Sequence, residues 1–331
     1  STIDPNGLNV GQFGNRNLII NGDFSISQRS TSVTGATSSG YATVDRWWHN
    51  ASGGTQNMSQ QSLAVGQTDL PSQFTKFFRF ASTSGNNNQG FAQKIENVEL
   101  LSGTTVTVSF YAKGTNPGAG SVELAYLQYF GSGGSANVEA APYNITLTSS
   151  WQLFKTTISL PSVSGKTIGA GNSTYVYFRQ GASDTSTAAW TMDVTGVQVE
   201  VSPTGEATPF EHRSFGDQLQ KCQRYFFKIE GATGDRCGIG GYVVGSTEAR
   251  FDFILPVSMR AVPTLSGSGQ AEFDASTDSA HFNVTDMVIN AAPTGIITGL
   301  GLQIATSGMV AGDGGSLRFT SAGTLTLSAE L

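Results

Sequence analysis

Aromatic, amide and arginine side chains occur on strand-like segments of this sequence, and together they could bind sugars. An aromatic ring packs flat against the C–H face of a sugar, while a planar amide or a guanidinium group hydrogen-bonds its hydroxyls. Tyr175, Tyr177 and Arg179 alternate with apolar residues and therefore share the outer face of a predicted strand. The predicted glycan-binding residues are Trp47, Trp48, Tyr126, Gln128, Tyr175, Tyr177 and Arg179. A single ring on a β-sandwich belongs more often to the core, and at least one of the neighbours Trp47 and Trp48 must point inward.

A calcium ion is the metal that the sequence could hold. Ca²⁺ takes hard oxygen ligands, which turn carbonyls and carboxylates on neighbouring strands supply. Asn21 and Asp23 start the first predicted strand, and Asp193 lies on the last strand of the same predicted domain. Since a sandwich can bring its terminal strands together, these three residues are a candidate calcium site. Turn formation by Asn21, Gly22 and Asp23 explains these residues equally well.

No pattern of residues typical of a catalytic centre is present. His49, His212 and His281 lie far apart and have no second ligand at a metal-binding spacing. We interpret Cys222 and Cys237 as two buried or unreactive thiols, and the alternative is a single disulfide between them. A glycosidase pair of carboxylates would leave no sequence signature, and we interpret the acids on strands as solvated. The sequence therefore predicts that the protein is not an enzyme.

The composition excludes several classes of protein. The chain has 331 residues, of which 41 are glycine and only 13% are charged. So little Glu and Lys disfavours an all-helical fold, whereas Gly, Ser, Thr and β-branched residues suit short strands and tight turns. The net charge of -6 provides no basic surface for nucleic acid. No apolar stretch is long enough to insert into a membrane.

Period-two alternation marks a series of strands and predicts an all-β fold. In the segment 105–111, Val106, Val108 and Phe110 face one way while Thr107 and Ser109 face the other. The predicted strands of the first part cover residues 74–80, 106–111, 122–130, 151–160, 175–179 and 190–201, after a first strand that begins at Asn17. Their spacing is typical of a β-sandwich.

The chain divides into an arm, two β-domains and a linking helix. At about 150 residues per domain, its length predicts about two domains. We expect an N-terminal arm over 1–16, a β-sandwich over 17–212, a linking helix over 213–228 and a smaller C-terminal β-sandwich over 229–331. Phe215, Leu219, Cys222 and Phe226 have helical spacing, and Ser214 can cap that helix. Late strands are expected within 281–287, 295–305 and 316–327.

Three groups of motifs resemble tail-fibre and minor structural proteins of tailed bacteriophages. The motifs are Asn17-Leu18-Ile19-Ile20-Asn21-Gly22-Asp23-Phe24 with Gln28-Arg29 and Asp45-Arg46-Trp47; Gln93-Lys94-Ile95-Glu96-Asn97 followed by 106–113; and Val197-Gln198-Val199-Glu200 through 207–213 to Cys222-Gln223-Arg224-Tyr225. The resemblance covers about residues 17–228. A shorter stretch, 255–264, is similar to distal domains that follow in such phage proteins.

The resemblance implies a fold and a role. The first domain looks like the jelly roll of carbohydrate-binding modules, in which a structural calcium often sits at positions that correspond to Asn21, Asp23 and Asp193. Ser25 departs from that pattern, because an acid often follows the Phe. The family implies a homotrimeric virion protein, assembled in the host cytoplasm, that contacts other virion proteins and a bacterial surface glycan or receptor. The alternatives are a capsid or tail decoration protein and a secreted polysaccharide-binding module.

Overall fold

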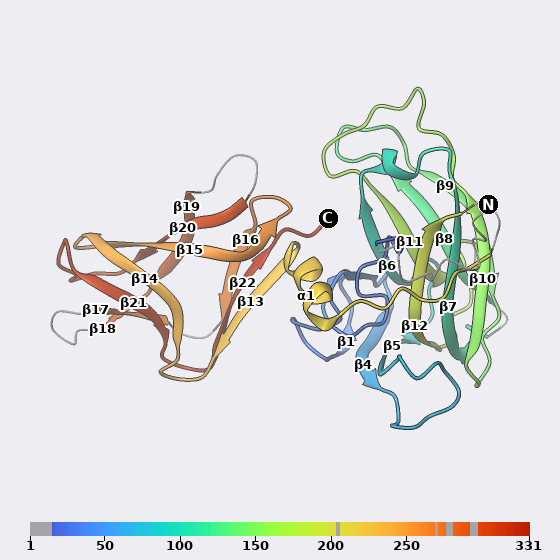
Figure 1. The fold of residues 1–331 in the computed structure, drawn as a ribbon, viewed down its shortest axis with the longest axis horizontal. Helices are drawn as coiled ribbons and strands as arrows, with labels where there is room; N and C mark the ends of the chain where they lie inside the picture. The colour runs from blue at the N-terminus through green and yellow to red at the C-terminus, as the bar shows by residue number, and fades with distance from the viewer. Residues whose placement is uncertain (1–14, 119, 203–205, 269–270, 276–280, 292–296) are drawn as a thin grey trace, which may run out of the picture. The chain divides into compact units, whose positions relative to one another are not determined.

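The chain folds into two compact units built almost entirely of β-strands (Figure 1). The structure is a computed structural model that describes residues 15–118, 120–202, 206–268, 271–275, 281–291 and 297–331. One unit comprises Ser1–Gln218 with Leu331, and the other comprises Leu219–Glu330. The all-β prediction is confirmed. Of the predicted N-terminal arm, residues 1–14 lie outside the described part of the chain.

The first unit is a jelly-roll sandwich of two antiparallel six-stranded sheets. Its strands are β1 (Ser32–Ala36), β2 (Gly40–Tyr41), β3 (Trp47–Asn50), β4 (Thr55–Ser62), β5 (Lys76–Ser84), β6 (Gly90–Glu96), β7 (Thr105–Thr115), β8 (Val122–Tyr129), β9 (Val138–Ile145), β10 (Gln152–Ser159), β11 (Ser173–Gln180) and β12 (Trp190–Val201). The first sheet has the order β1-β4-β5-β12-β7-β10, and the second sheet has the order β2-β3-β6-β11-β8-β9. A 3-10 helix, Val98–Leu101, follows β6.

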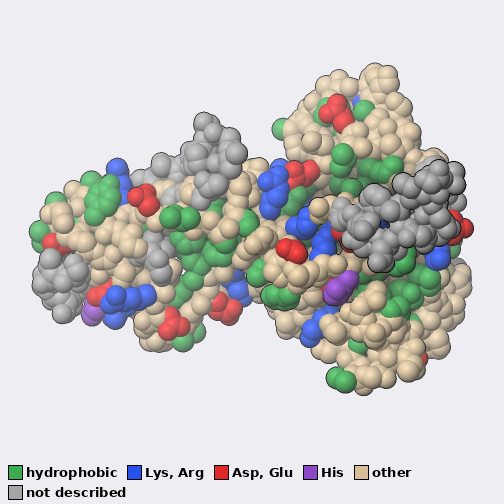
Figure 2. Space-filling view, viewed as in Figure 1, with side chains coloured by type: hydrophobic (Ala, Val, Ile, Leu, Met, Phe, Trp, Pro, Cys, Tyr) green, Lys and Arg blue, Asp and Glu red, His purple; other side chains and the backbone are tan. Residues whose placement is uncertain are grey.

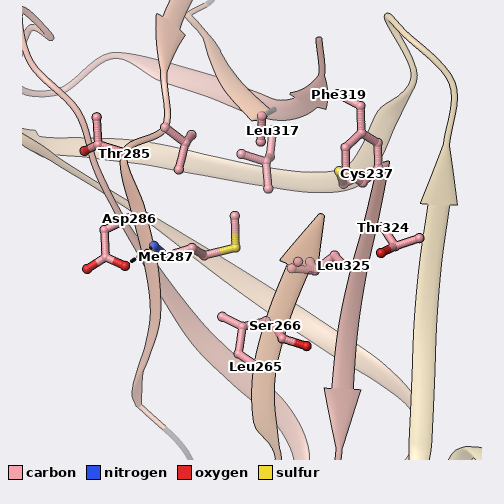
Figure 3. A pocket seen from close by; sticks show the side chains of 13 residues that line it. Cys237, Leu265, Ser266, Thr285, Asp286, Met287, Leu317, Phe319, Thr324 and Leu325 are labelled. Atoms are coloured by element: carbon pink, nitrogen blue, oxygen red, sulfur yellow. Dashed lines mark hydrogen bonds between the residues drawn. The ribbon is translucent and has the colours of Figure 1, made fainter. Parts of the chain in front are cut away.

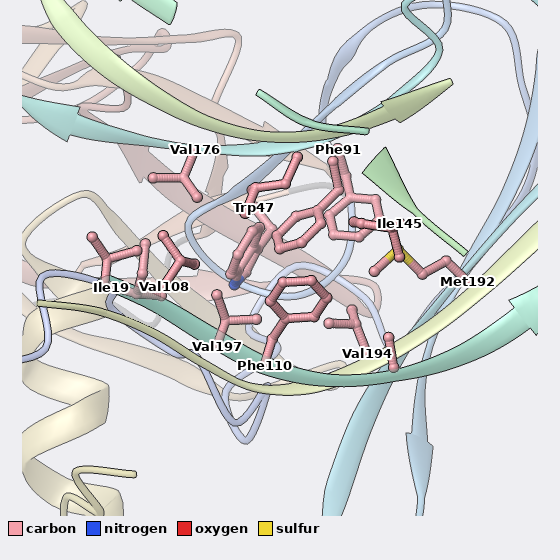
Figure 4. Packing of buried hydrophobic residues seen from close by; sticks show 14 of the residues in the cluster. Ile19, Trp47, Phe91, Val108, Phe110, Ile145, Val176, Met192, Val194 and Val197 are labelled. Carbon is pink, nitrogen blue, oxygen red and sulfur yellow. The ribbon is translucent and has the colours of Figure 1, made fainter. Parts of the chain in front are cut away.

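The two sheets enclose one aromatic core. Alternate residues of every long strand point inward, so that Phe110 on β7 meets Phe178 on β11 with ring centroids 5.0 Å apart. Trp47 lies at the centre, 5.0 Å from the Phe24 ring and 5.9 Å from that of Phe91. Figure 4 shows Trp47, Phe91 and Phe110 in the space between the layers. Packing of this kind fixes which face of each strand is left for binding.

The segment 17–20 does not form the strand that its apolar residues predict; side-chain amides hold it instead. Asn17 is buried, and its Nδ2 donates to the carbonyl of Val197 at 3.1 Å. Its Oδ1 accepts from the N–H groups of Ile19 and Val199, each at 3.0 Å. Gln93 bonds the N–H and carbonyl of Ile20 with both ends of its amide, at 2.8 and 2.7 Å. Together with one backbone bond, from the Leu18 N–H to the Val199 carbonyl at 2.9 Å, these amides satisfy the backbone groups that a strand would pair in a ladder.

Residues 208–213 close over the same segment from the other side. Glu211 accepts hydrogen bonds from the N–H groups of Asn15 and Asn17, at 2.5 and 2.7 Å. Arg213 donates to the carbonyls of Asn17 and Ile19, at 2.6 and 3.0 Å. Gln198 Oε1 accepts from the Glu211 N–H at 2.7 Å and so holds Glu211 in place. We call these side chains the N-terminal clamp: Asn17, Gln93, Gln198, Glu211 and Arg213. Much of the resemblance to phage proteins therefore lies in residues that close the sandwich.

The second unit is the smaller β-domain that the sequence predicts. It contains β13 (Phe226–Gly231), β14 (Arg236–Gly245), β15 (Glu248–Met259), β16 (Thr264–Ser268), β17 (Ala271–Ala275), β18 (His281–Asn283), β19 (Asp286–Ala291), β20 (Ile297–Ala305), β21 (Gly314–Phe319) and β22 (Gly323–Ser328). A three-stranded sheet, β13-β22-β16, and a seven-stranded sheet, β18-β17-β21-β14-β15-β20-β19, share a core around Phe251 and Phe273. The expected strand within 281–287 is split between β18 and β19.

The helix between the domains is shorter than the sequence predicts. It spans α1 (Phe215–Gln223), and Ser214 caps it because its Oγ accepts from the Asp217 N–H at 3.2 Å. Cys222 and Cys237 are both buried, and no disulfide links them. In the part of the chain that is described, no helix is both long and apolar enough to cross a membrane. Figure 2 shows a mostly uncharged surface on the face in view, with the charged side chains in small groups.

Candidate functional site

The outer face of the second sheet carries a row of aromatic side chains. Because side chains alternate along a strand, inward Trp47 on β3 leaves Trp48 outward, and inward Val176 and Phe178 on β11 leave Tyr175 and Tyr177 outward. Tyr129 ends β8 on the same face, two residues beyond Leu127, which lies opposite Tyr175. We call Trp48, Tyr129, Tyr175 and Tyr177 the aromatic row.

The members of the aromatic row contact one another edge to face. The Trp48 ring lies 6.2 Å from that of Tyr175 and 6.4 Å from that of Tyr177, at interplanar angles of 67° and 63°. Tyr129 extends the row from Tyr175, at 6.1 Å. Lys94 Nζ lies 5.0 Å from the centre of the Trp48 ring and 5.1 Å from that of Tyr175. Trp48, Tyr129 and Tyr175 are each only partly buried, so solvent reaches these three rings.

Tyr177 supports the row from below. Its neighbours in register are Ala92 on β6 and Ala125 on β8, and these short side chains leave space in which the Tyr177 ring lies flat and buried. The Tyr177 hydroxyl donates to the Asn88 carbonyl and accepts from Asn50 Nδ2 at 2.7 Å. Burial raises the pKa of Tyr177, and burial likewise raises the pKa of Tyr175 to about 12. Both rings therefore stay neutral across the physiological range.

Arg179 ends the row as part of a charge cluster. Its guanidinium group is buried and lies 3.3 Å from the Glu123 carboxylate, directly opposite on β8. It also binds Glu139 of β9, with Nη2 and Oε1 2.5 Å apart. The Arg179 guanidinium carbon sits 5.6 Å from the centre of the Tyr177 ring. Since both carboxylates fix the guanidinium group, the cluster gives one end of the row a rigid polar boundary.

The structure corrects the placement of three predicted glycan-binding residues. Trp47 is 2% exposed, and its Nε1 donates to the Asn21 carbonyl at 3.0 Å inside the sandwich. Tyr126 is fully buried between the sheets. Gln128 is 1% exposed and donates to the Pro161 carbonyl at 2.8 Å. A ligand on the sheet surface reaches none of the three, whereas Trp48, Tyr175, Tyr177 and Arg179 do share one face.

Two members of this face were not predicted. Tyr129 is outward because Glu123 and Leu127, at even spacing from it, are outward as well. Lys94 lies opposite Tyr175 on β6. Polar Glu123 alternates with apolar Leu124, and this alternation could have placed Tyr129, six residues after Glu123, on the outer face. No sequence signal pairs Lys94 with the ring of Trp48.

The side chains of the three predicted calcium ligands are each bonded to other groups of the protein. Asp193 points outward from β12 and forms a bidentate pair with Arg79, both bonds 2.7 Å long. Asn21 is bonded to Ile26 and to the Asp45 carbonyl through its side chain. Asp23 Oδ1 accepts from the Ser25 hydroxyl at 3.0 Å. Among the described residues, no group of three or more His, Cys, Asp or Glu side chains could hold a metal ion.

The second unit contains a hollow of about 350 Å³ (Figure 3). Leu265 and Leu325 of the small sheet and Met287 and Leu317 of the large sheet line it. Among the described residues that line it, Asp286 is the one carboxylate, and its Oδ1 accepts from the Met287 N–H at 2.8 Å. The lining thus combines aliphatic surface with the polar side chains of Ser266, Thr285, Asp286 and Thr324.

Comparisons with known proteins show similarity to solved structures only. No protein-family model and no curated protein sequence matches the chain. One similar structure is the enzymatically active domain of tailspike protein 4 of bacteriophage CBA120, with 14% identity and a TM-score of 0.33 over 56% of this chain and 22% of that one. The chain thus spans about a fifth of the length of that tailspike structure.

Two further similar structures are binding modules. The C-terminal family 22 carbohydrate-binding module of Clostridium thermocellum Xyn10B matches 48% of this chain and 87% of its own, with 14% identity and a TM-score of 0.32. The N-terminal cellulose-binding domain of a Cellulomonas fimi glucanase matches 39% of this chain and 80% of its own, with 19% identity and a TM-score of 0.29.

Proposed function

We propose that this chain is a bacteriophage virion protein without enzymatic activity, a tail fibre or receptor-binding protein whose first unit binds a bacterial surface glycan. The observation that carries the proposal is the aromatic row on the outer face of the second sheet. Three partly exposed rings, of which Trp48 and Tyr175 contact the Lys94 ammonium, form a surface on which sugar C–H faces can stack. The phage part of the proposal rests on the sequence motifs.

Binding on this face needs little rearrangement. Tyr177 and the Arg179 cluster hold the rings from beneath and from one end, so the surface is formed before a ligand arrives. We propose that Trp48 and Tyr175 stack on successive sugars. Glu123 binds Arg179 through Oε2, and no bond of Oε1 is found within the described residues, so Oε1 is left to accept a sugar hydroxyl.

Weak single sites would become useful in an oligomer. We propose a homotrimer, in which linked sites gain roughly 10² to 10⁴ in avidity over one site. Light scattering tests this step, because one chain has a mass of 34.7 kDa and three have about 104 kDa. A monomer would contradict the trimer and would favour a secreted polysaccharide-binding module.

The decisive experiment compares Trp48→Ala with the native chain on an array of bacterial surface glycans. Trp151→Ala is the matched control, since Trp151 is another partly exposed tryptophan, packed against Phe77 and Lys113 on the first sheet. We expect a loss of at least about tenfold in affinity for Trp48→Ala, equivalent to about 1.4 kcal/mol. Binding that survives in Trp48→Ala, or that is lost equally in Trp151→Ala, contradicts the proposed face.

Two further measurements separate the alternative roles. Immunogold labelling at the distal tail supports receptor binding, whereas labelling of the capsid alone would show a decoration protein. Incubation with the bound polysaccharide should release no reducing sugar, and its release would show that the chain is a depolymerase.

A further inference from the structure

We infer that the first unit has a second ligand site, on the outer face of its first sheet, for a sugar residue that carries a carboxylate. A pocket of about 340 Å³ lies there. Strands β7 and β10 form its floor, and the segments 71–74 and 207–210 form its walls. The pocket belongs to the sheet opposite the aromatic row, so this inference is independent of the proposed function.

Aromatic packing fixes the walls of the pocket. The Phe74 ring lies 5.6 Å from that of Tyr111 and 5.1 Å from that of Phe210, both in edge-to-face arrangements. Gly196 has a φ of +65°, and a Cβ at this position would lie 2.6 Å from Phe74 Cζ. Only glycine therefore lets the Phe74 ring approach β12 so closely. Thr208, two residues before Phe210, is bonded through its hydroxyl to Glu200 at 2.8 Å, which holds the opposite wall.

The polar groups on the floor have no partners within the described part of the chain. Lys155 on β10 lies directly opposite Ser109 on β7, and Leu153 lies directly opposite Tyr111. The Lys155 ammonium makes no ion pair, and the hydroxyls of Ser109 and Tyr111 make no hydrogen bond, with any described residue. No carboxylate is found among the described residues that line the pocket. The pocket thus combines one unpaired positive charge and two hydroxyls with apolar walls.

These features select the chemical class of the ligand. The carboxylate of a uronic acid can pair with Lys155 Nζ, while ring hydroxyls bond Ser109 and Tyr111. The C–H face of the sugar can pack on Leu153 and Phe210. The volume lies at the lower end of the roughly 300–1,000 Å³ range of small-molecule sites and suits one or two sugar residues. A neutral sugar of the same shape would leave the ammonium unpaired.

A titration with matched acidic and neutral sugars tests the inference. The probes are digalacturonic acid and the neutral digalactose of the same linkage, each titrated calorimetrically into the native chain, Lys155→Met and Trp48→Ala. We expect the acidic sugar to bind at least about tenfold more tightly than the neutral one, because the neutral sugar lacks the charge-assisted hydrogen bond to Lys155. Lys155→Met should remove this preference, and added salt should weaken acidic binding.

The controls distinguish this site from the aromatic row. Lys155 is an exposed strand residue, so its replacement should leave the fold intact, and Lys166→Met removes another lysine of the same unit outside the pocket. Trp48→Ala and Lys166→Met should bind the acidic sugar as the native chain does. The inference is overturned if the acidic sugar does not bind, if it binds no better than the neutral one, or if Lys155→Met binds it unchanged. Loss of acidic binding in Trp48→Ala alone would assign that ligand to the aromatic row.

Discussion

Trp47 and Trp48 are neighbours in the chain, and their side chains lie on opposite faces of the same sheet. The Trp47 ring is enclosed by Phe24, Phe91 and Phe178 in the core. The Trp48 ring lies among Lys94, Tyr175 and Tyr177 on the surface. One residue therefore serves stability and the next is free to serve binding.

We expect the two tryptophans to respond differently to truncation. Trp47→Ala leaves a large cavity and should lower the free energy of unfolding by about 3–5 kcal/mol. Trp48→Ala removes a partly exposed ring and should cost less than about 1.5 kcal/mol, the upper end for a lost aromatic pair. Urea denaturation followed by circular dichroism measures both. Equal losses of stability would show that Trp48 is also a core residue.

Alkaline titration should reveal the raised pKa of Tyr175 in the aromatic row. Burial raises the pKa of Tyr175 from 10.0 to about 12 in the folded chain, whereas the unfolded chain keeps the ordinary value. The unfolded state therefore loses its proton first, and stability should fall as the pH rises from about 10 to about 12. The tyrosinate absorbance of the native chain, compared with Tyr175→Phe, should lose a component that titrates near the upper value. An early component instead would place Tyr175 in open solvent.

The N-terminal clamp should make a large contribution to stability. Asn17→Ala removes three hydrogen bonds from a buried site. At about 0.5–1.5 kcal/mol for each bond, the free energy of unfolding should fall by about 1.5–4.5 kcal/mol. Asn87→Ala, which removes one exposed bond to the Ala182 carbonyl, is the control and should cost far less. A small effect of Asn17→Ala would mean that the segment 17–20 is held mainly by its apolar side chains.

Acid should open the same clamp through Glu211. Desolvation opposes ionisation of this carboxyl, but the N–H groups of Asn17 and Asn15 and the charge of Arg213 outweigh it and lower the pKa of Glu211 below 4.5. The resulting stabilisation is present above the unfolded pKa and is lost as the pH falls through the folded one. Thermal unfolding at a series of acid pH values should show a smaller pH dependence in Glu211→Gln than in the native chain. An identical pH dependence would exclude Glu211 as a source.

Calcium should not stabilise the chain through Asn21, Asp23 and Asp193. Asn21 Oδ1 accepts from the Ile26 N–H, Asp23 Oδ1 accepts from the Ser25 hydroxyl, and Asp193 is paired with Arg79. A site that bound the ion would raise stability by about 2.7 kcal/mol at a hundredfold excess over its Kd. We expect the thermal midpoint to be the same with calcium and with EDTA. A rise with calcium that is lost in Asp193→Asn would restore the predicted site.

Alternation identified strands where one face is clearly polar. The strand predicted over 190–201 has the bounds of β12, and Tyr175, Tyr177 and Arg179 share a face as expected. On β8 both faces carry apolar residues, since Leu124 is inward and Leu127 is outward. Gln128 is buried and its Nε2 donates to the Pro161 carbonyl inside the sandwich, so a polar residue there did not mark the surface.

The clamp and the pocket could not be derived from local patterns. Asn17 and Val197 are 180 positions apart, and only the closed sandwich shows that one binds the other. The pocket likewise needs Phe74, Gly196 and Phe210 to meet from three separate segments. Such contacts depend on the tertiary fold, whereas periodicity reports only on neighbours along a strand.

The separation of the N-terminal clamp from the aromatic row has a consequence for how such a protein could change. The clamp closes the sandwich through amides and charges that contact backbone, and it shares no residue with the row. Substitutions at Trp48, Tyr129 or Tyr175 therefore alter the outward chemistry while the closure stays in place. A virus that carried this domain could therefore change its host by a few point mutations, none of which would unfold the domain.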